Sequence, residues 1–147
     1  MTSSLFKELG LSALTFLGLD ALWIGLVMSD HFNKLVEEIQ GSKMEASIFP
    51  AILCYIVLVG GLYYFVIQRM NKKFDIWNIL SLSVPFGLCV FGTYDFTTAT
   101  IFKKWDMTTA FLDVLWGITA SSLTAITVGL YRSWSDDRNL EEVHADR

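Results

Sequence analysis

Long stretches of this 147-residue chain contain no charged residue. Residues 46–68 give 23 uncharged positions, residues 76–94 give 19 and residues 114–131 give 18, while residues 9–29 would form a fourth run but for Asp20. A helix needs about 20 apolar residues to cross a hydrocarbon core about 30 Å thick. The pattern therefore predicts an all-α fold in a single domain, a four-helix transmembrane bundle with spans at about 9–29, 46–68, 76–101 and 108–131.

A polar helix face is also missing. A soluble helical bundle would show one at the 3.6-residue period, and residues 46–68 show none. The first ten residues carry one lysine, and no small-residue cleavage site precedes Asp20, so we expect the first span to remain in the mature protein.

The chain has few of the residues on which membrane enzymes depend. Its histidines, His31 and His144, are too few for a di-iron centre or a haem held by two histidines. Cys54 and Cys89 stand alone and are interpreted as packing residues. There is no nucleophile with a partner histidine within a span, no phosphate-binding glycine loop and no basic stripe. We expect no cofactor, metal or nucleic-acid partner, and we favour a non-enzymatic role.

The distribution of lysine and arginine predicts the orientation of the bundle. One side would carry seven of these residues and the other four, namely Lys34, Lys43, Lys103 and Lys104. Since the richer side includes both ends of the chain, we expect both termini to face the cytoplasm or its equivalent. The polar tail, residues 133–147, is expected to be frayed or disordered.

The connection between the first two spans predicts a short amphipathic helix on the outer membrane surface. Its apolar residues Phe32, Leu35, Val36 and Ile39 recur at helical spacing. Ser29 or Asp30 could cap its start and Gly41 could end it. A plain loop is the alternative. In the third span, Pro85 should bend the helix, and the hydroxyls of Ser81 or Ser83 could bond the carbonyl that it frees.

Three aspartates interrupt the spans at equal depth. Taking Lys104 as the middle of the turn between the third and fourth spans, Asp95 lies nine residues before it and Asp113 nine after it. Asp20 lies nine residues before Ser29, at the same end of the bundle. An ionised carboxylate in hydrocarbon costs several kcal/mol, so each should face the interior and find donors or bind a proton.

Donors lie near each aspartate in the sequence. Trp23 and Trp116 follow Asp20 and Asp113 by three residues, on the same helix faces. Thr93, Thr97 and Thr98 surround Asp95, and Tyr94 and Tyr55 could donate phenolic protons. The fourth span also has a face of small and polar residues, which favours close packing between helices: Thr109, Asp113, Gly117, Ala120, Ser121, Thr124 and Thr127.

Three interpretations of the aspartates stay open. They could form a buried hydrogen-bond network that fixes the fold, or contact a partner subunit, either another membrane protein or a second copy. They could also line a polar cavity for a proton, an ion or a small polar ligand. Three carboxylates in a low dielectric would not all be ionised. The candidate binding or proton-handling residues are Asp20, Trp23, Asp95, Thr97, Thr98, Asp113 and Trp116, and a divalent metal on the aspartates is a less favoured alternative.

The stretch FGTYDFTTATIFKKWDMTTAFLDVLWG, residues 91–117, resembles the hallmark of a family of small membrane proteins known as domain of unknown function 2177. The family pattern also begins with Asp-x-x-Trp in the first span, matched here by Asp20 and Trp23. The resemblance covers about residues 10–131. It implies a four-helix membrane protein without an assigned activity, and at most a role associated with lipid metabolism. Many members have Asn where this chain has Thr98, which makes the polar site here less rich.

Overall fold

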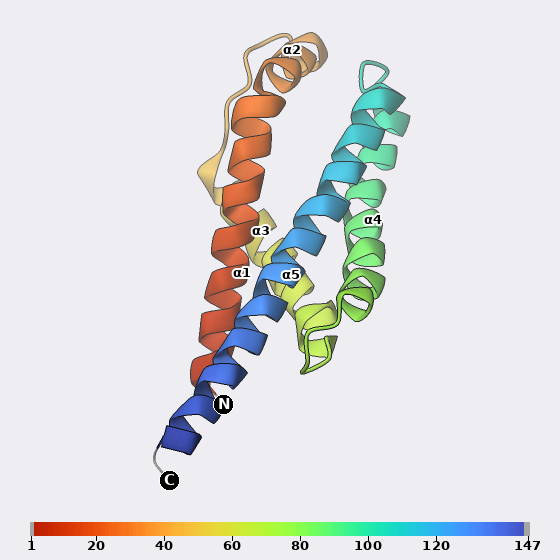
Figure 1. Cartoon of the computed structure of the whole chain (residues 1–147). Helices are drawn as coiled ribbons and strands as arrows, with labels where there is room; N and C mark the ends of the chain where they lie inside the picture. The colour runs from red at the N-terminus through yellow and green to blue at the C-terminus, as the bar shows by residue number, and fades with distance from the viewer. Residues whose placement is uncertain (1, 146–147) are drawn as a thin grey trace.

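Four long helices lie alongside one another in the computed structural model, which describes the backbone of residues 2–145 and the side chains of residues 4–138. Both ends of the chain lie at the same end of the bundle (Figure 1). We call this the terminal end, and we call the opposite end, with the turn at residues 102–106, the hairpin end. The described residues form helices and connections, without a β-strand.

The first span leads directly into the short connecting helix. Helix α1 (Thr2–Leu22) continues as a π-helical segment, η1 (Trp23–Val27), and α2 (Ser29–Gln40) follows across the hairpin end (Figure 1). Because η1 runs on into α2, the N-cap position of α2 is Met28, whose side chain makes no capping hydrogen bond. The expectation that Ser29 or Asp30 caps this helix is therefore wrong. Its end at Gly41, with φ of 74°, is as expected.

The other spans follow in antiparallel order. Helix α3 (Ile48–Phe65) and a short 3₁₀ turn, η2 (Ile67–Arg69), return to the terminal end, and α4 (Ile76–Ile101) and α5 (Met107–Ala145) form a hairpin. Helix α4 has the bounds predicted from the sequence and runs through Pro85. The two nearby hydroxyls have other partners: Ser81 donates to the Asn78 carbonyl at 2.8 Å, and Ser83 pairs with Ser122 at 3.0 Å.

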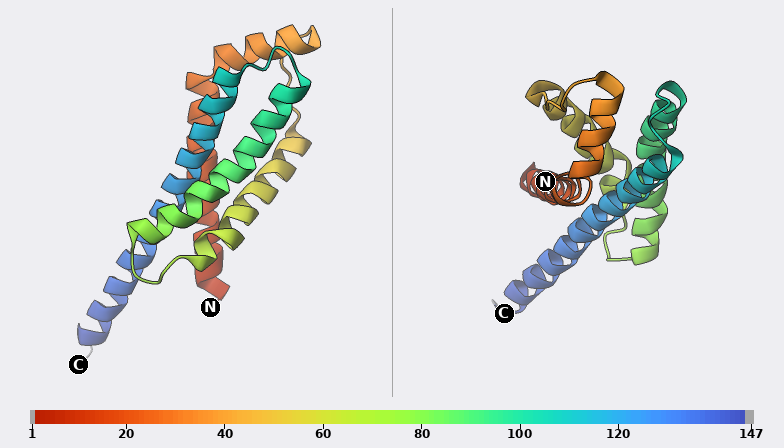
Figure 2. Two further views of the ribbon diagram at one scale, coloured as in Figure 1. Left: turned by 90° about the vertical axis from the view of Figure 1, so that its right-hand side faces the viewer. Right: turned by 90° about the horizontal axis from the view of Figure 1, so that it is seen from above.

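The polar tail was expected to be frayed, and this is wrong for the described backbone, since α5 continues as helix to Ala145. No glycine or proline interrupts residues 133–145. The guanidinium of Arg138 lies 4.6 Å from the centroid of the Trp134 ring one turn earlier, which supports this part of the helix. Its last turns extend beyond the other helices (Figure 2). Residues 146 and 147 lie outside the described residues.

Helices α4 and α5 approach closely because small residues lie between them. A Cβ atom on Gly87 would lie 2.7 Å from the Cα of Ile118, so no larger residue fits there without a shift. Ala120, Ser121 and Thr124, on the predicted small and polar face of α5, are fully buried. This close approach brings the side chains of α4 and α5 at the hairpin end into direct contact.

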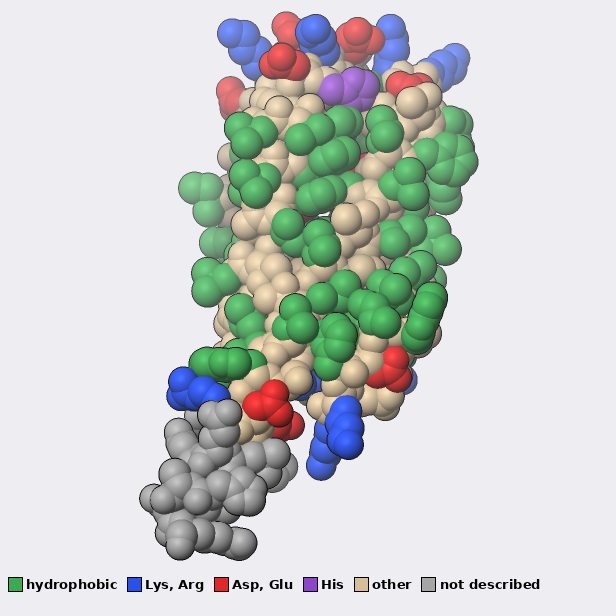
Figure 3. Space-filling model, viewed as in Figure 1, with side chains coloured by type: hydrophobic (Ala, Val, Ile, Leu, Met, Phe, Trp, Pro, Cys, Tyr) green, Lys and Arg blue, Asp and Glu red, His purple; other side chains and the backbone are tan. Residues whose placement is uncertain are grey.

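The outside of the bundle is apolar. Large side chains such as Leu14, Leu26 and Val57 are about three-quarters exposed, at 75%, 76% and 74%. On the face shown in Figure 3, hydrophobic side chains form a band across the middle of the molecule, with charged side chains at both ends. Four helical stretches are long and apolar enough to cross a membrane: Ser4–Val27, Ile48–Arg69, Ile76–Ile101 and Met107–Arg138. The chain is a multi-span integral membrane protein.

Candidate functional site: a layer of three aspartates and three tryptophans

The three intramembrane aspartates converge from three helices near the hairpin end. Asp20 of α1 is 7% exposed, Asp95 of α4 is fully buried and Asp113 of α5 is partly buried. Each accepts a hydrogen bond from an indole N–H, and the carboxyl groups of Asp95 and Asp113 are near enough to interact electrostatically. We call the three carboxyl groups, together with the side chains that donate to them, the carboxyl layer.

The two Asp-x-x-Trp motifs pair with each other across the bundle. Trp116 of α5 donates to Asp20 of α1 at 2.8 Å, and Trp23 at the start of η1 donates to Asp113 of α5 at 3.4 Å. The two indole rings are stacked, with centroids 4.7 Å apart and planes 5° apart. Each motif therefore supplies the donor for the aspartate of the other, and the stacked rings fix the distance between α1 and α5.

The π-helical turn begins at Trp23. The N–H of Met28 donates to the Trp23 carbonyl at 2.8 Å, which accommodates one more residue in the turn than an α-helix would. The position of the Trp23 ring therefore depends on a local departure from α-helical geometry. A π-helical turn next to a buried polar cluster is a common arrangement at functional sites.

Asp20 is the best satisfied of the three aspartates. Its second carboxylate oxygen accepts from the phenol of Tyr55 in α3 at 2.8 Å. Sequence reasoning identified Tyr55 as a distant donor, and the phenol belongs to the layer. Asp20 thus connects three spans, because α1 carries it and α5 and α3 supply its donors.

Asp95 has one donor and one unsatisfied oxygen. Trp105, in the turn between α4 and α5, donates to Oδ1 at 3.2 Å, whereas Oδ2 is buried and has no donor among the described residues. A buried polar atom without a partner costs about 1–3 kcal/mol. The carboxyl group of Asp113 is the neighbouring group that could relieve this cost, provided that one of the two carries a proton.

Trp105 was not among the predicted site residues. It is 9% exposed and packs between Phe32 of α2, with ring centroids 6.1 Å apart, and Tyr94 of α4, also at 6.1 Å. Helical spacing gives no direction for a side chain in a turn, so the period of the sequence could not place this ring. The signal that was available is a tryptophan beside two lysines in a very short hairpin.

Thr97 and Thr98 do not donate to the aspartates. The hydroxyl of Thr98 donates to the Tyr94 carbonyl of its own helix at 2.7 Å. Thr97 is exposed and lines a shallow groove on the outward face of α4 together with Thr93 and Thr100. The donors to Asp95 are therefore fewer than the sequence suggested.

Helix α2 covers the layer from the hairpin end. Leu35 is buried against Trp105 and Ala110, and His31 lies 2.7 Å from the hydroxyl of Thr109. Asp106 begins α5 and accepts from the backbone N–H of Thr109 at 2.9 Å, which lowers the pKa of its carboxyl group. An ion pair between Lys104 and Glu38 at 3.1 Å adds a surface contact.

A second polar cluster, which the sequence did not predict, lies at the terminal end. Arg132 of α5 donates to both carboxylate oxygens of Glu8 in α1, at 2.9 and 2.7 Å, and to the Ile67 carbonyl at 3.0 Å. The two side chains are only 20% and 12% exposed. The bidentate pair connects α1 with α5, and the bond to Ile67 adds the turn η2. The available signal was that Glu8 and Arg132 each lie one residue outside an expected span, 9–29 and 108–131, at the same end of the bundle.

Within the described residues, no group of three histidine, cysteine or acidic side chains is arranged to hold a metal ion. The carboxyl layer combines neutral N–H and O–H donors with carboxyl groups, which are able to gain or lose a proton.

Comparison with known proteins agrees with the motifs quoted above. No curated protein and no solved structure matches the chain. One family model, described as a predicted membrane protein and named domain of unknown function 2177, matches residues 5–130. Because the match spans most of the sequence and all the aspartates and tryptophans of the layer, the chain belongs to that family.

Proposed function

We propose that this integral membrane protein binds and exchanges a proton at the carboxyl layer. The observation that carries the proposal is the fully buried Asp95, whose Oδ2 atom has no donor among the described residues and whose carboxyl group has that of Asp113 as an electrostatic neighbour. Two ionised carboxylates in contact in a low dielectric repel each other strongly. A proton shared between them removes the repulsion and supplies the missing donor.

The indole donors favour a proton over a larger ligand. Asp20 is already satisfied by Trp116 and Tyr55, and the stacked pair of Trp23 and Trp116 occupies the space between α1 and α5. What remains for a ligand is the unpaired oxygen of Asp95. The two threonines that the sequence suggested for a small polar ligand do not serve the layer, because Thr98 donates to the backbone of its own helix and Thr97 is exposed.

Infrared spectroscopy of the protein in lipid tests the proposal. We expect the C=O stretch of a protonated carboxylic acid at neutral pH, its loss on titration to alkaline pH, and its absence from Asp95→Asn and Asp113→Asn. Asp30→Asn, on the exposed face of α2, is the matched control and should keep the band. A spectrum without this band at neutral pH would contradict proton sharing.

Proton flux in reconstituted vesicles extends the test to function. If the layer exchanges protons, an imposed pH gradient should decay faster with the wild type than with either asparagine variant, because an amide cannot ionise. Equal decay in all three proteins, together with an unchanged infrared spectrum, would favour a structural network or an accessory subunit.

The accessory role is the second candidate, and one observation favours it. The outward face of α4 carries a groove of about 490 Å³. Exposed Thr93, Thr97 and Thr100, with Gly92, give this face the small and polar residues that pack against other membrane helices. Crosslinking from Thr97→Cys, with Leu14→Cys on α1 as control, would identify a membrane partner or a second copy on this face.

The distribution of charge supports a proposal for the orientation of the bundle. The terminal end carries the larger share of lysine and arginine, so we place it and both termini on the cytoplasmic side, with α2 on the opposite membrane surface. In a variant without Cys54 and Cys89, a cysteine introduced at Lys73 should react only from the cytoplasmic face, and one at Ser42 only from the outside. The reverse result would invert this topology.

A further inference from the structure

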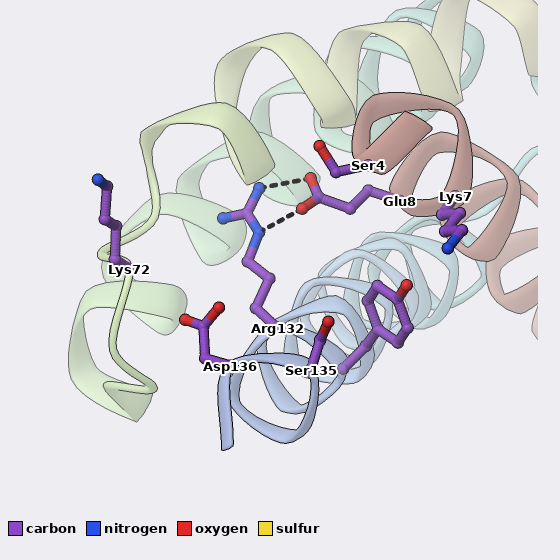
Figure 4. Close-up of a pocket in the computed structure, with 8 residues that line it drawn as sticks. Ser4, Lys7, Glu8, Lys72, Arg132, Ser135 and Asp136 are labelled. Atoms are coloured by element: carbon purple, nitrogen blue, oxygen red, sulfur yellow. Dashed lines mark hydrogen bonds and ion pairs between the residues drawn. The ribbon is translucent and has the colours of Figure 1, made fainter. Parts of the chain in front are cut away.

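A polar cleft opens at the terminal end, away from the carboxyl layer (Figure 4). It has a volume of about 420 Å³, in the range of small-ligand sites. Helix α1, the connection before α4 and helix α5 all contribute to its lining: Ser4, Lys7, Glu8, Lys72, Tyr131, Arg132, Ser135 and Asp136.

The charges of the cleft favour an anion. Arg132 and Glu8 neutralise each other through their bidentate pair. Lys7 and Lys72 lie on opposite sides of that pair (Figure 4), and among residues 4–138 no acidic side chain forms an ion pair with either of them. Asp136 alone opposes these two lysines, so the cleft keeps a net positive charge.

The cleft lies where phospholipid headgroups are found. Its residues belong to the first turns of the apolar stretch Ser4–Val27 and to the last turns of Met107–Arg138, while Lys72 lies in the connection between the second and third stretches. Basic pockets between membrane helices at this level bind the phosphate groups of lipids. The hydroxyls of Ser135 and Tyr131 add neutral groups that could bond phosphate oxygens.

We propose that this cleft binds a phosphate group supplied by the headgroup of an anionic phospholipid and attracted by the charges of Lys7 and Lys72. The bidentate pair of Arg132 and Glu8 lies between the two lysines (Figure 4) and holds α1 against α5. The proposal does not depend on proton exchange at the carboxyl layer.

Native mass spectrometry of the detergent-solubilised protein, titrated with phosphatidylglycerol, tests this site. Each lysine near a headgroup contributes about 1 kcal/mol, so Lys7→Gln or Lys72→Gln should weaken binding about fivefold, and the double variant about 25-fold. Asp136→Asn should strengthen binding because it removes the opposing charge. Lys72→Arg should retain binding, and Lys103→Gln, at the hairpin end, is the matched control.

Two results would overturn the proposal. One is binding that stays within twofold of the wild type in the double lysine variant, and the other is an equal loss in Lys103→Gln. Inorganic phosphate, added to the lipid complex, identifies the source of the phosphate group. If inorganic phosphate does not displace the lipid, the result supports a headgroup site. If millimolar phosphate displaces it, the site recognises phosphate, and the natural ligand is a soluble phosphate compound rather than a lipid.

Discussion

Substitution of Asp95 tests whether its carboxyl group is neutral or charged in the folded protein. If Asp95 and Asp113 share a proton, Asp95→Asn keeps the interactions of the pair. In the variant, the amide oxygen accepts from the indole N–H of Trp105, which lies 3.2 Å from Oδ1 in the wild type. The amide N–H₂ donates to Asp113. We expect the free energy of unfolding to change by less than about 1 kcal/mol.

Asp95→Ala should cost more. It leaves the buried indole N–H of Trp105 without its acceptor, for about 1–3 kcal/mol, and it opens a small cavity where the side chain was fully buried. Because hydrogen bonds between membrane helices average only about 0.6 kcal/mol, we expect the two costs together to lower the free energy of unfolding by about 2 kcal/mol rather than more.

Reversible unfolding in mixed micelles, followed by tryptophan fluorescence at neutral pH, gives both differences. Asp30→Asn, on the exposed face of α2, should leave the unfolding free energy unchanged and serves as the control. An Asn variant as unstable as the Ala variant would mean that the charge of Asp95 stabilises the fold, and this result would refute proton sharing.

Three further predictions concern the ends of the bundle and the stacked rings, all measured as unfolding free energies. Trp116→Phe should destabilise by about 1 kcal/mol more than Trp23→Phe, because its bond to the carboxylate is 2.8 rather than 3.4 Å long and both variants can still stack; equal losses would contradict this. Arg132→Met should cost about 3 kcal/mol by leaving the acid unpaired, and Glu8→Gln in the same chain should recover most of it; additive losses would refute the pairing. Because the pKa of Asp106 is lowered in the folded protein, its contribution is present at neutral pH and lost in acid. Asp106→Ala should therefore be less stable than the wild type at pH 7, with the gap closing below about pH 4; a constant gap would contradict this.

The spans could be predicted from the sequence because burial in lipid depends mainly on composition and length. Helix α4 has the predicted bounds, 76–101, since Asp75 caps its start and the hairpin turn follows its end. Helix α1 begins before residue 9, and the composition of the span alone could not predict this. Lys7 and Glu8 precede the apolar run, and Glu8 is tolerated there because Arg132, 124 residues later, pairs with it.

The common depth of Asp95 and Asp113 could also be predicted, because a short turn forces two helices to run antiparallel from the same level. The distribution of donors could not. The hydrogen bond from Trp105 depends on the path of a five-residue turn, and the threonines near Asp95 in sequence lie on other sides of α4. Neighbours in sequence were therefore a poor guide to neighbours in space at this site.

The repeated Asp-x-x-Trp motif has an explanation in helix geometry. An indole three residues after an aspartate lies about one turn further along the same face, so in an antiparallel pair of helices it can be level with the aspartate of the facing helix. Helices α1 and α5 run in opposite directions, so the tryptophan of each motif meets the aspartate of the other. In an antiparallel pair of otherwise regular helices, both bonds would be equivalent. Here the π-helical turn begins at Trp23, and it is the bond from this residue that is longer, at 3.4 Å. Asp113, rather than Asp20, thus has the longer indole bond, and Asp113 is also the aspartate whose neighbour is the carboxyl group of Asp95.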